Sequence, residues 1–196
     1  MSYYDNYGDV MTALLSCKSI VLELLKENGN LLEIVSPALQ NDREVVLTAV
    51  QSSGKSIGNA SPTLRSDETI FSIALKNDGY ALKYASDDQK NNKDIVMIAI
   101  QSSKYALLFA SKELKNNKEV VMESVKLFPE SLQYASEQVK DDKDFITTLI
   151  QETKSEYIML FVSERLYNDE DLISKAIQEN PRSKLIIRDR DEAMVS

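Results

Sequence analysis

The chain has 196 residues, with 31 acidic against 23 basic side chains and a formal charge of −8. It has no histidine and one cysteine, which excludes histidine-based catalytic triads, histidine-ligated metals, cysteine-cluster zinc sites and an intrachain disulfide. The acidic balance disfavours nucleic acids and anionic membrane surfaces, which are bound largely through lysine and arginine. Apolar runs are short, and Asp5 and Asp9 stand where a secretory signal is basic. We therefore expect a cytoplasmic protein without a signal peptide or transmembrane segment.

A repeat of 25 residues organises the sequence. The stretches 64–88, 89–113 and 114–138 align without a gap, and the same frame covers 14–38 and 39–63. It extends to 139–165 with two extra residues, and more loosely to 166–190. We predict a single repeat domain over 1–196, in which 1–13 form an N-terminal extension and 191–196 a tail.

Each unit begins with an amphipathic helix. In the second unit, Val45, Val46, Ala49 and Val50 form an apolar stripe with helical spacing, and the other units carry equivalent sets. An asparagine or aspartate precedes each stripe from the second unit on, at Asp42, Asp67, Asn92, Asn117, Asp142 and Asp169. We interpret these residues as helix N-caps. They do not indicate calcium sites, because no unit has the acidic loop closed by glutamate that calcium sites use.

Two short helices should complete each unit. Gly29, Gly54 and Gly79 recur where the first helix ends, and we expect them to be left-handed. A short helix around Leu82 and Ala85 follows in the third unit. A recurring serine then predicts the start of a single-turn helix, at Ser36, Ser61, Ser86, Ser111, Ser136 and Ser163.

The first unit departs from this pattern at its cap position. Cys17 is a poor cap, and helix-forming residues run from Val10 to Lys26 without a breaker. We predict one long helix that starts near Asp9 and buries Cys17 as an inert thiol.

No unit can bury its apolar stripe alone, so the units must stack. The predicted fold is all-α, an α-solenoid of about seven 25-residue helical repeats that form a right-handed superhelix.

The run Tyr80-Ala81-Leu82-Lys83-Tyr84-Ala85-Ser86, together with residues 114–121 (LKNNKEVV), resembles a known repeat. It is similar to the domain of unknown function 4116 repeat family, most clearly over residues 39–146. The resemblance implies an all-α repeat module and a role like that of the effector-like proteins of intracellular bacteria in which this repeat occurs. It implies no catalytic residues.

One repeat position carries an aromatic ladder, at Tyr84, Phe109, Tyr134 and Phe161. The rings either seal the seams between neighbouring short helices or form a strip on a binding face. Basic residues accompany them in the middle units. If the strip binds a partner, the expected contacts are Tyr84, Phe109, Tyr134, Lys83, Lys104 and Lys115.

We therefore expect a non-enzymatic helical-repeat scaffold that binds another protein, which would be a host protein if the chain is a translocated effector. No cofactor, metal, nucleic acid or membrane partner is expected, and the chain should be a monomer or a weak dimer. One alternative is a protein that sequesters a small ligand, such as a nucleotide or another anion, at helix N-termini and lysines. A second alternative is a carboxylate-based enzyme, although no spacing singles out a pair of acids.

Overall fold

The computed structural model describes residues 11–188, and the chain divides into two compact units, residues 1–103 and 104–196. The helix start near Asp9, most of the extension over 1–13 and the tail over 191–196 lie outside the described residues. Between residues 11 and 188 the regular elements are all helices. The predicted all-α repeat solenoid is confirmed, while the single domain and the right-handed superhelix stay predictions.

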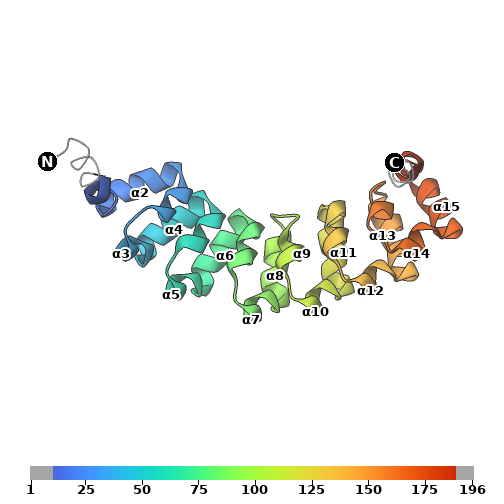
Figure 1. Cartoon of the computed structure of the whole chain (residues 1–196), viewed down its shortest axis with the longest axis horizontal. Coiled ribbons are helices and arrows are strands. Elements are labelled where there is room, and N and C mark those ends of the chain that lie inside the picture. The colour runs from blue at the N-terminus through green and yellow to red at the C-terminus, as the bar shows by residue number, and fades with distance from the viewer. Residues whose placement is uncertain (1–10, 189–196) are drawn as a thin grey trace. The chain divides into compact units, whose positions relative to one another are not determined.

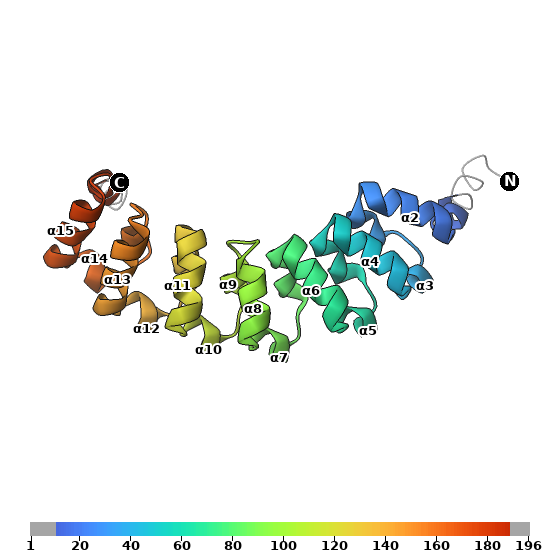
Figure 2. The same ribbon diagram turned by 180° about the vertical axis from the view of Figure 1, so that it is seen from behind.

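The first unit is a stack of four long helices joined by short connecting helices (Figure 1). Figure 2 shows the linking helices α3, α5 and α7 along one edge of this stack. In chain order the elements are α2 (Lys18–Glu27), η1 (Gly29–Glu33), α3 (Pro37–Gln40), α4 (Arg43–Ser52), η2 (Gly54–Asn59), α5 (Pro62–Arg65), α6 (Glu68–Asn77), η3 (Gly79–Tyr84), α7 (Asp87–Lys90) and α8 (Lys93–Ile100).

The second unit repeats the plan, and residues 183–188 at its end are also helical. Its two extra residues follow α13, where Lys154 adopts a left-handed conformation with φ of 49°. Its elements are α9 (Ala106–Phe109), α10 (Lys112–Lys115), α11 (Lys118–Leu127), η4 (Pro129–Tyr134), α12 (Glu137–Lys140), α13 (Lys143–Thr153), η5 (Ile158–Leu160), α14 (Glu164–Tyr167) and α15 (Glu170–Glu179).

The predicted caps hold the starts of the long helices. Asp42 accepts hydrogen bonds from the backbone N–H groups of Glu44 and Val45, and Asn117 accepts from those of Glu119 and Val120. The predicted stripes are buried, as Val45, Val46, Ala49 and Val50 show. Consecutive long helices of a unit pack against each other, so stacking of the repeats supplies the apolar burial that no repeat has alone.

The recurring serines join consecutive repeats as well as starting the linking helices. The Ser61 hydroxyl accepts from the backbone N–H of Leu64, and the Ser61 N–H donates to the Gln40 carbonyl of the preceding repeat at 2.9 Å. Ser136 makes the equivalent N–H bond to the carbonyl of Lys115 in the second unit, also at 2.9 Å. The serine position therefore carries a bond within the repeat and a bond between repeats.

The glycines recur for a different reason from the one predicted. None of the described glycines has a positive φ, so the expected left-handed conformation is wrong. Gly29, Gly54 and Gly79 each begin a 3₁₀ helix against the next long helix, and a Cβ on Gly54 would overlap the carbonyl oxygen of Ala74. The recurring glycine permits close approach of two backbones.

The single long helix predicted at the N-terminus is also wrong. Residues 11–14 are helical, a turn follows at 15–16, and α2 begins after Cys17. The turn leaves the Leu15 carbonyl free to accept the Ser36 N–H at 3.1 Å, which is the same inter-repeat bond that Ser61 makes. Cys17 is half-buried, and the Ser19 hydroxyl 3.4 Å from its Sγ lowers the pKa of the thiol, so the expected fully buried thiol is wrong as well.

Candidate binding groove between α6 and α8

An ion pair spans most seams between consecutive long helices within a unit. The basic residue that opens one long helix reaches the capping aspartate of the next, as in Arg43 and Asp67 at 3.4 Å. The other pairs are Lys18–Asp42 at 2.8 Å, Lys118–Asp142 at 2.5 Å and Lys143–Asp169 at 2.8 Å. The hydrogen bond from Lys18 is the main cause that lowers the pKa of Asp42, and Lys118 acts in the same way on Asp142. Each pair ties one repeat to the next.

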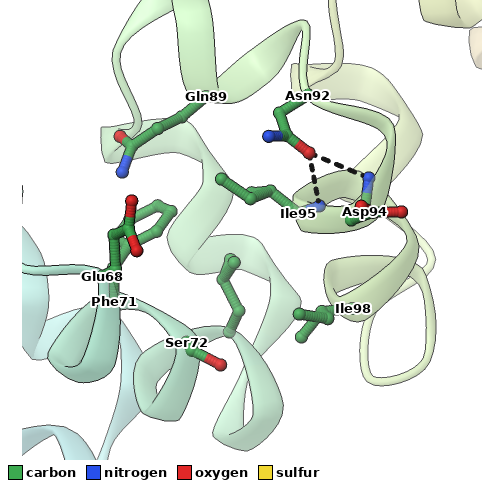
Figure 3. Close-up of a pocket in the computed structure, with 9 residues that line it drawn as sticks. Glu68, Phe71, Ser72, Gln89, Asn92, Asp94, Ile95 and Ile98 are labelled. Atoms are coloured by element: carbon green, nitrogen blue, oxygen red, sulfur yellow. Dashed lines mark hydrogen bonds between the residues drawn. The ribbon is translucent and has the colours of Figure 1, made fainter.

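The seam between α6 and α8 lacks this pair. Glu68 is the first residue of α6, whereas the long helices of the ion-paired seams, α2, α4, α11 and α13, each begin with lysine or arginine. The cap that faces Glu68 is the neutral Asn92. The Asn92 side-chain oxygen accepts from the N–H groups of Asp94 at 3.0 Å and Ile95 at 3.2 Å (Figure 3). Glu68 has no ion pair with any residue between 11 and 188. The seam therefore has no charge pair to close it.

The linking helix α7 also lacks its usual apolar side chain. Gln89 holds the repeat position that is occupied elsewhere by buried apolar residues, namely Leu39, Leu64, Leu114, Val139 and Leu166. The Gln89 side chain instead accepts from the Ser86 N–H at 2.9 Å, while the Ser86 hydroxyl accepts from the Gln89 N–H. This capping box holds the glutamine side chain at the start of α7, so it does not fill the seam as leucine does.

These departures leave a cavity of about 270 Å³ between α6 and α8. Figure 3 shows Glu68 and Gln89 towards one side of it and Asn92 and Asp94 towards the other, with Ile95 between them. Phe71, Leu75, Ser72 and Ile98 complete the lining. We call this cavity, together with the adjoining hollow of about 300 Å³ that adds Ser66, Ser86 and Asp88, the α6–α8 groove.

The groove joins an apolar floor to an acidic rim. Ile95 is half-buried where its counterparts Val45 and Ile70 are fully buried, and Asn92 is exposed where Asp42 and Asp67 are half-buried. The carboxylates of Glu68, Asp88 and Asp94 line the groove, and no lining residue is basic. The groove is therefore suited to a group that is both apolar and positively charged.

The residues expected as partner contacts are divided between the two units. In the first unit, the Lys83 ammonium lies 5.8 Å from the centre of the Tyr84 ring, and this ring packs against Gly58 of the preceding repeat. Tyr84 therefore seals a seam, which is one of the two roles expected for the aromatic ladder. Lys83 is exposed and Tyr84 is half-buried.

In the second unit, Lys104 lies 5.5 Å from the centre of the Tyr105 ring, and the Tyr105 and Tyr134 rings are 6.3 Å apart. Burial, followed by the neighbouring Tyr105, raises the pKa of Tyr134. Lys104 also pairs with Glu130 at 3.5 Å. The structure thus brings Lys104 and Tyr134 into one cluster.

Phe109 and Lys115 are the remaining expected contacts. Both are half-buried, Phe109 at the end of α9 and Lys115 at the end of α10. Burial lowers the pKa of Lys115. Partner binding through all six of these residues stays a prediction.

The groove residues were missed in the sequence, although the repeat alignment contained a signal for them. Gln89 interrupts a column of leucine and valine, and Glu68 interrupts a column of lysine and arginine. Both changes belong to the same seam. This becomes apparent only from the structure, in which the repeat positions of Glu68 and Gln89 line one cavity. Among residues 11–188, no three acidic or cysteine side chains gather as a metal site would require, and no helix is long and apolar enough to cross a membrane.

A family model described as a domain of unknown function (DUF4116) matches residues 17–65, 67–115 and 117–167. Each match begins at the cap of a long helix and spans two of the 25-residue repeats. The comparisons with curated proteins and with solved structures gave no match. The three matches cover most of the chain, which therefore belongs to the DUF4116 family, a family of helical repeat proteins of unknown function.

Proposed function

We propose that this protein is a non-enzymatic scaffold that binds another protein through the α6–α8 groove. The observation that carries the proposal is that Glu68 and Gln89 interrupt the seam pattern together and leave one seam of the first unit with an open apolar floor. The other polar repeat positions are used in caps and seams, as Asp42 and Ser61 illustrate. A groove in which the half-buried Ile95 and Ile98 stand beside an unpaired charged rim is suited to side chains of a partner.

The alternative of a nucleotide or anion site has less support. Glu68, Asp88 and Asp94 repel a phosphate, and no lysine or arginine lines the groove to neutralise one.

The alternative of a carboxylate enzyme rests on Glu68 and Asp94, which line the same cavity. Glycosidase chemistry requires one carboxyl to stay protonated as a general acid, and that in turn requires burial or a close second carboxylate. Both residues are exposed. Binding is therefore the better proposal, and the host target that the family resemblance implies remains part of it.

Selection from a displayed library of random peptides tests the proposal. The full chain is immobilised in parallel with the double variant Glu68→Lys/Gln89→Leu, which restores the seam pattern and fills the groove. We expect wild type to enrich peptide sequences that the filled variant does not retain. Enrichment of the same sequences on both proteins would place binding elsewhere, and no enrichment on either protein would count against a peptide-binding scaffold.

A further inference from the structure

Resting on the proposed function, we infer that the α6–α8 groove takes a lysine or arginine side chain from a basic segment of the partner protein. The partner's cation would occupy the place that a basic residue of the chain itself occupies at the other seams. The argument comes from what those seams contain and from what this one lacks.

At the α2–α4 and α13–α15 seams, a basic side chain from one long helix contacts two acids of the next. Lys18 pairs with the cap Asp42 at 2.8 Å and with Glu44, two residues further on, also at 2.8 Å. Lys143 likewise pairs with Asp169 at 2.8 Å and with Asp171 at 3.6 Å. The second acid is thus part of the cation's binding place in both units.

At the α6–α8 seam this second acid is present but its cation is not. Asp94 stands two residues after the cap Asn92, in the position of Glu44, and lines the groove. Glu68 replaces the basic donor and lines the same groove from α6. Two carboxylates therefore border one cavity without a counter-charge, and a single cation from outside satisfies both.

The apolar floor selects the kind of cation. The half-buried Ile95 and Ile98 form the accessible apolar surface of the cavity, and Ile95 projects between its charged ends (Figure 3). Phe71 and Leu75, which also line the cavity, are fully buried. The methylene groups of a lysine or arginine side chain pack on such a surface while the charged head stays at the polar rim. A bare metal ion would leave these walls unused. The adjoining hollow, with Asp88 on its rim, has space for a residue that flanks the inserted side chain.

The test is a titration of the ¹⁵N-labelled full chain, followed by amide chemical shifts. The probe is the blocked peptide acetyl-Ala-Leu-Lys-Leu-Ala-amide, and its matched control has norleucine in place of lysine, which keeps the methylene stem and removes the charge. We expect the lysine peptide to shift the amides of Gln89, Asn92, Asp94 and Ile95. The norleucine peptide should bind about tenfold more weakly, the scale expected for loss of a charge-assisted contact.

Variants assign the effect to the two carboxylates. Glu68→Gln and Asp94→Asn should each weaken binding of the lysine peptide about fivefold or more. Glu68→Lys should abolish it, because the chain then supplies its own cation to Asp94. Glu33→Gln is the matched control, since Glu33 is an exposed acid of the same unit in η1, away from the groove, and it should leave binding unchanged.

The inference is overturned if the norleucine and lysine peptides bind equally, or if neither shifts the groove amides. It is also overturned if calcium chloride alone reproduces the amide shifts, which indicates a metal site. It is overturned as well if the groove amides shift with protein concentration in the absence of peptide, which indicates that a second copy of the chain occupies the groove. The peptide selection separates this failure from that of the proposed function. Enriched sequences without basic residues would retain a protein-binding groove and reject the basic side chain.

Discussion

Gly79 and Ala99 approach so closely that a Cβ on the glycine would overlap the Ala99 carbonyl oxygen. The same relationship joins Gly54 to Ala74. In each case the obstacle is backbone of the next long helix, which cannot rotate aside as a side chain can. These contacts determine how closely a 3₁₀ helix of one repeat packs against the next repeat.

The substitution Gly79→Ala should therefore be strongly destabilising. We expect the free energy of unfolding to fall by about 3 kcal/mol, the upper end of the cost of overpacking. Urea denaturation followed by circular dichroism measures it. Lys104→Ala is the matched control, because position 104 holds the same place in the repeat and already carries a Cβ, and it should change stability by less than about 0.5 kcal/mol. Equal effects of the two substitutions would contradict the close-approach explanation.

Ser124 gives a prediction of the opposite sign. It lies within the apolar stripe of α11, is fully buried, and its hydroxyl has no hydrogen-bond partner among the described residues. Removal of an unsatisfied buried hydroxyl should raise the free energy of unfolding by about 1 kcal/mol in Ser124→Ala. Ser56→Ala is the comparison, because the buried Ser56 hydroxyl donates to the Ser53 carbonyl at 2.7 Å and its loss should destabilise. A destabilised Ser124→Ala would reveal a partner for that hydroxyl.

Gln89→Leu should stabilise the first unit. Leucine at this position is buried in the neighbouring linking helices, and burial of such a side chain contributes about 1.5–3 kcal/mol. Part of this gain is offset by loss of the capping box between Gln89 and Ser86, at about 0.5–1 kcal/mol. We expect the free energy of unfolding, measured by urea denaturation, to rise by about 1 kcal/mol in Gln89→Leu. Gln138→Leu, on the exposed side of α12, should show no such gain.

Stability should fall in acid because of the seam aspartates. Lys18 lowers the folded-state pKa of Asp42 below its unfolded value of about 3.9, so this contribution is complete above that value and is lost as the pH falls through the folded pKa. The partner Lys18 has a raised pKa, so its contribution is present below its unfolded value of about 10.4 and is lost only at higher pH.

Urea unfolding at about pH 7, 5 and 3 tests this, with wild type beside Asp42→Asn, which retains a capping side chain. We expect both proteins to be nearly independent of pH between about 7 and 5, and the variant to lose less stability than wild type between about 5 and 3. An identical loss in the two proteins would show that Asp42 does not contribute to the acid sensitivity.

The sequence by itself determined the repeat, the positions of the long helices and their caps. These features depend on residues three or four positions apart, as when Asn117 accepts the backbone N–H of Val120 or Ser61 that of Leu64. Periodic apolar stripes then required the units to stack, because each stripe is buried only by its neighbour. The all-α solenoid followed from these local patterns, and the family from the resemblance of the repeat sequence.

Tertiary structure alone decided the features that join residues 20 or more positions apart. The turn before Cys17 frees the Leu15 carbonyl for the Ser36 N–H, and the glycines recur where the next long helix approaches them. The groove depends on Glu68 and Gln89, which belong to one seam that no local pattern reveals. The physical reason is that a helix is stabilised by hydrogen bonds within one turn, whereas the shape of a seam depends on side chains that two repeats bring together.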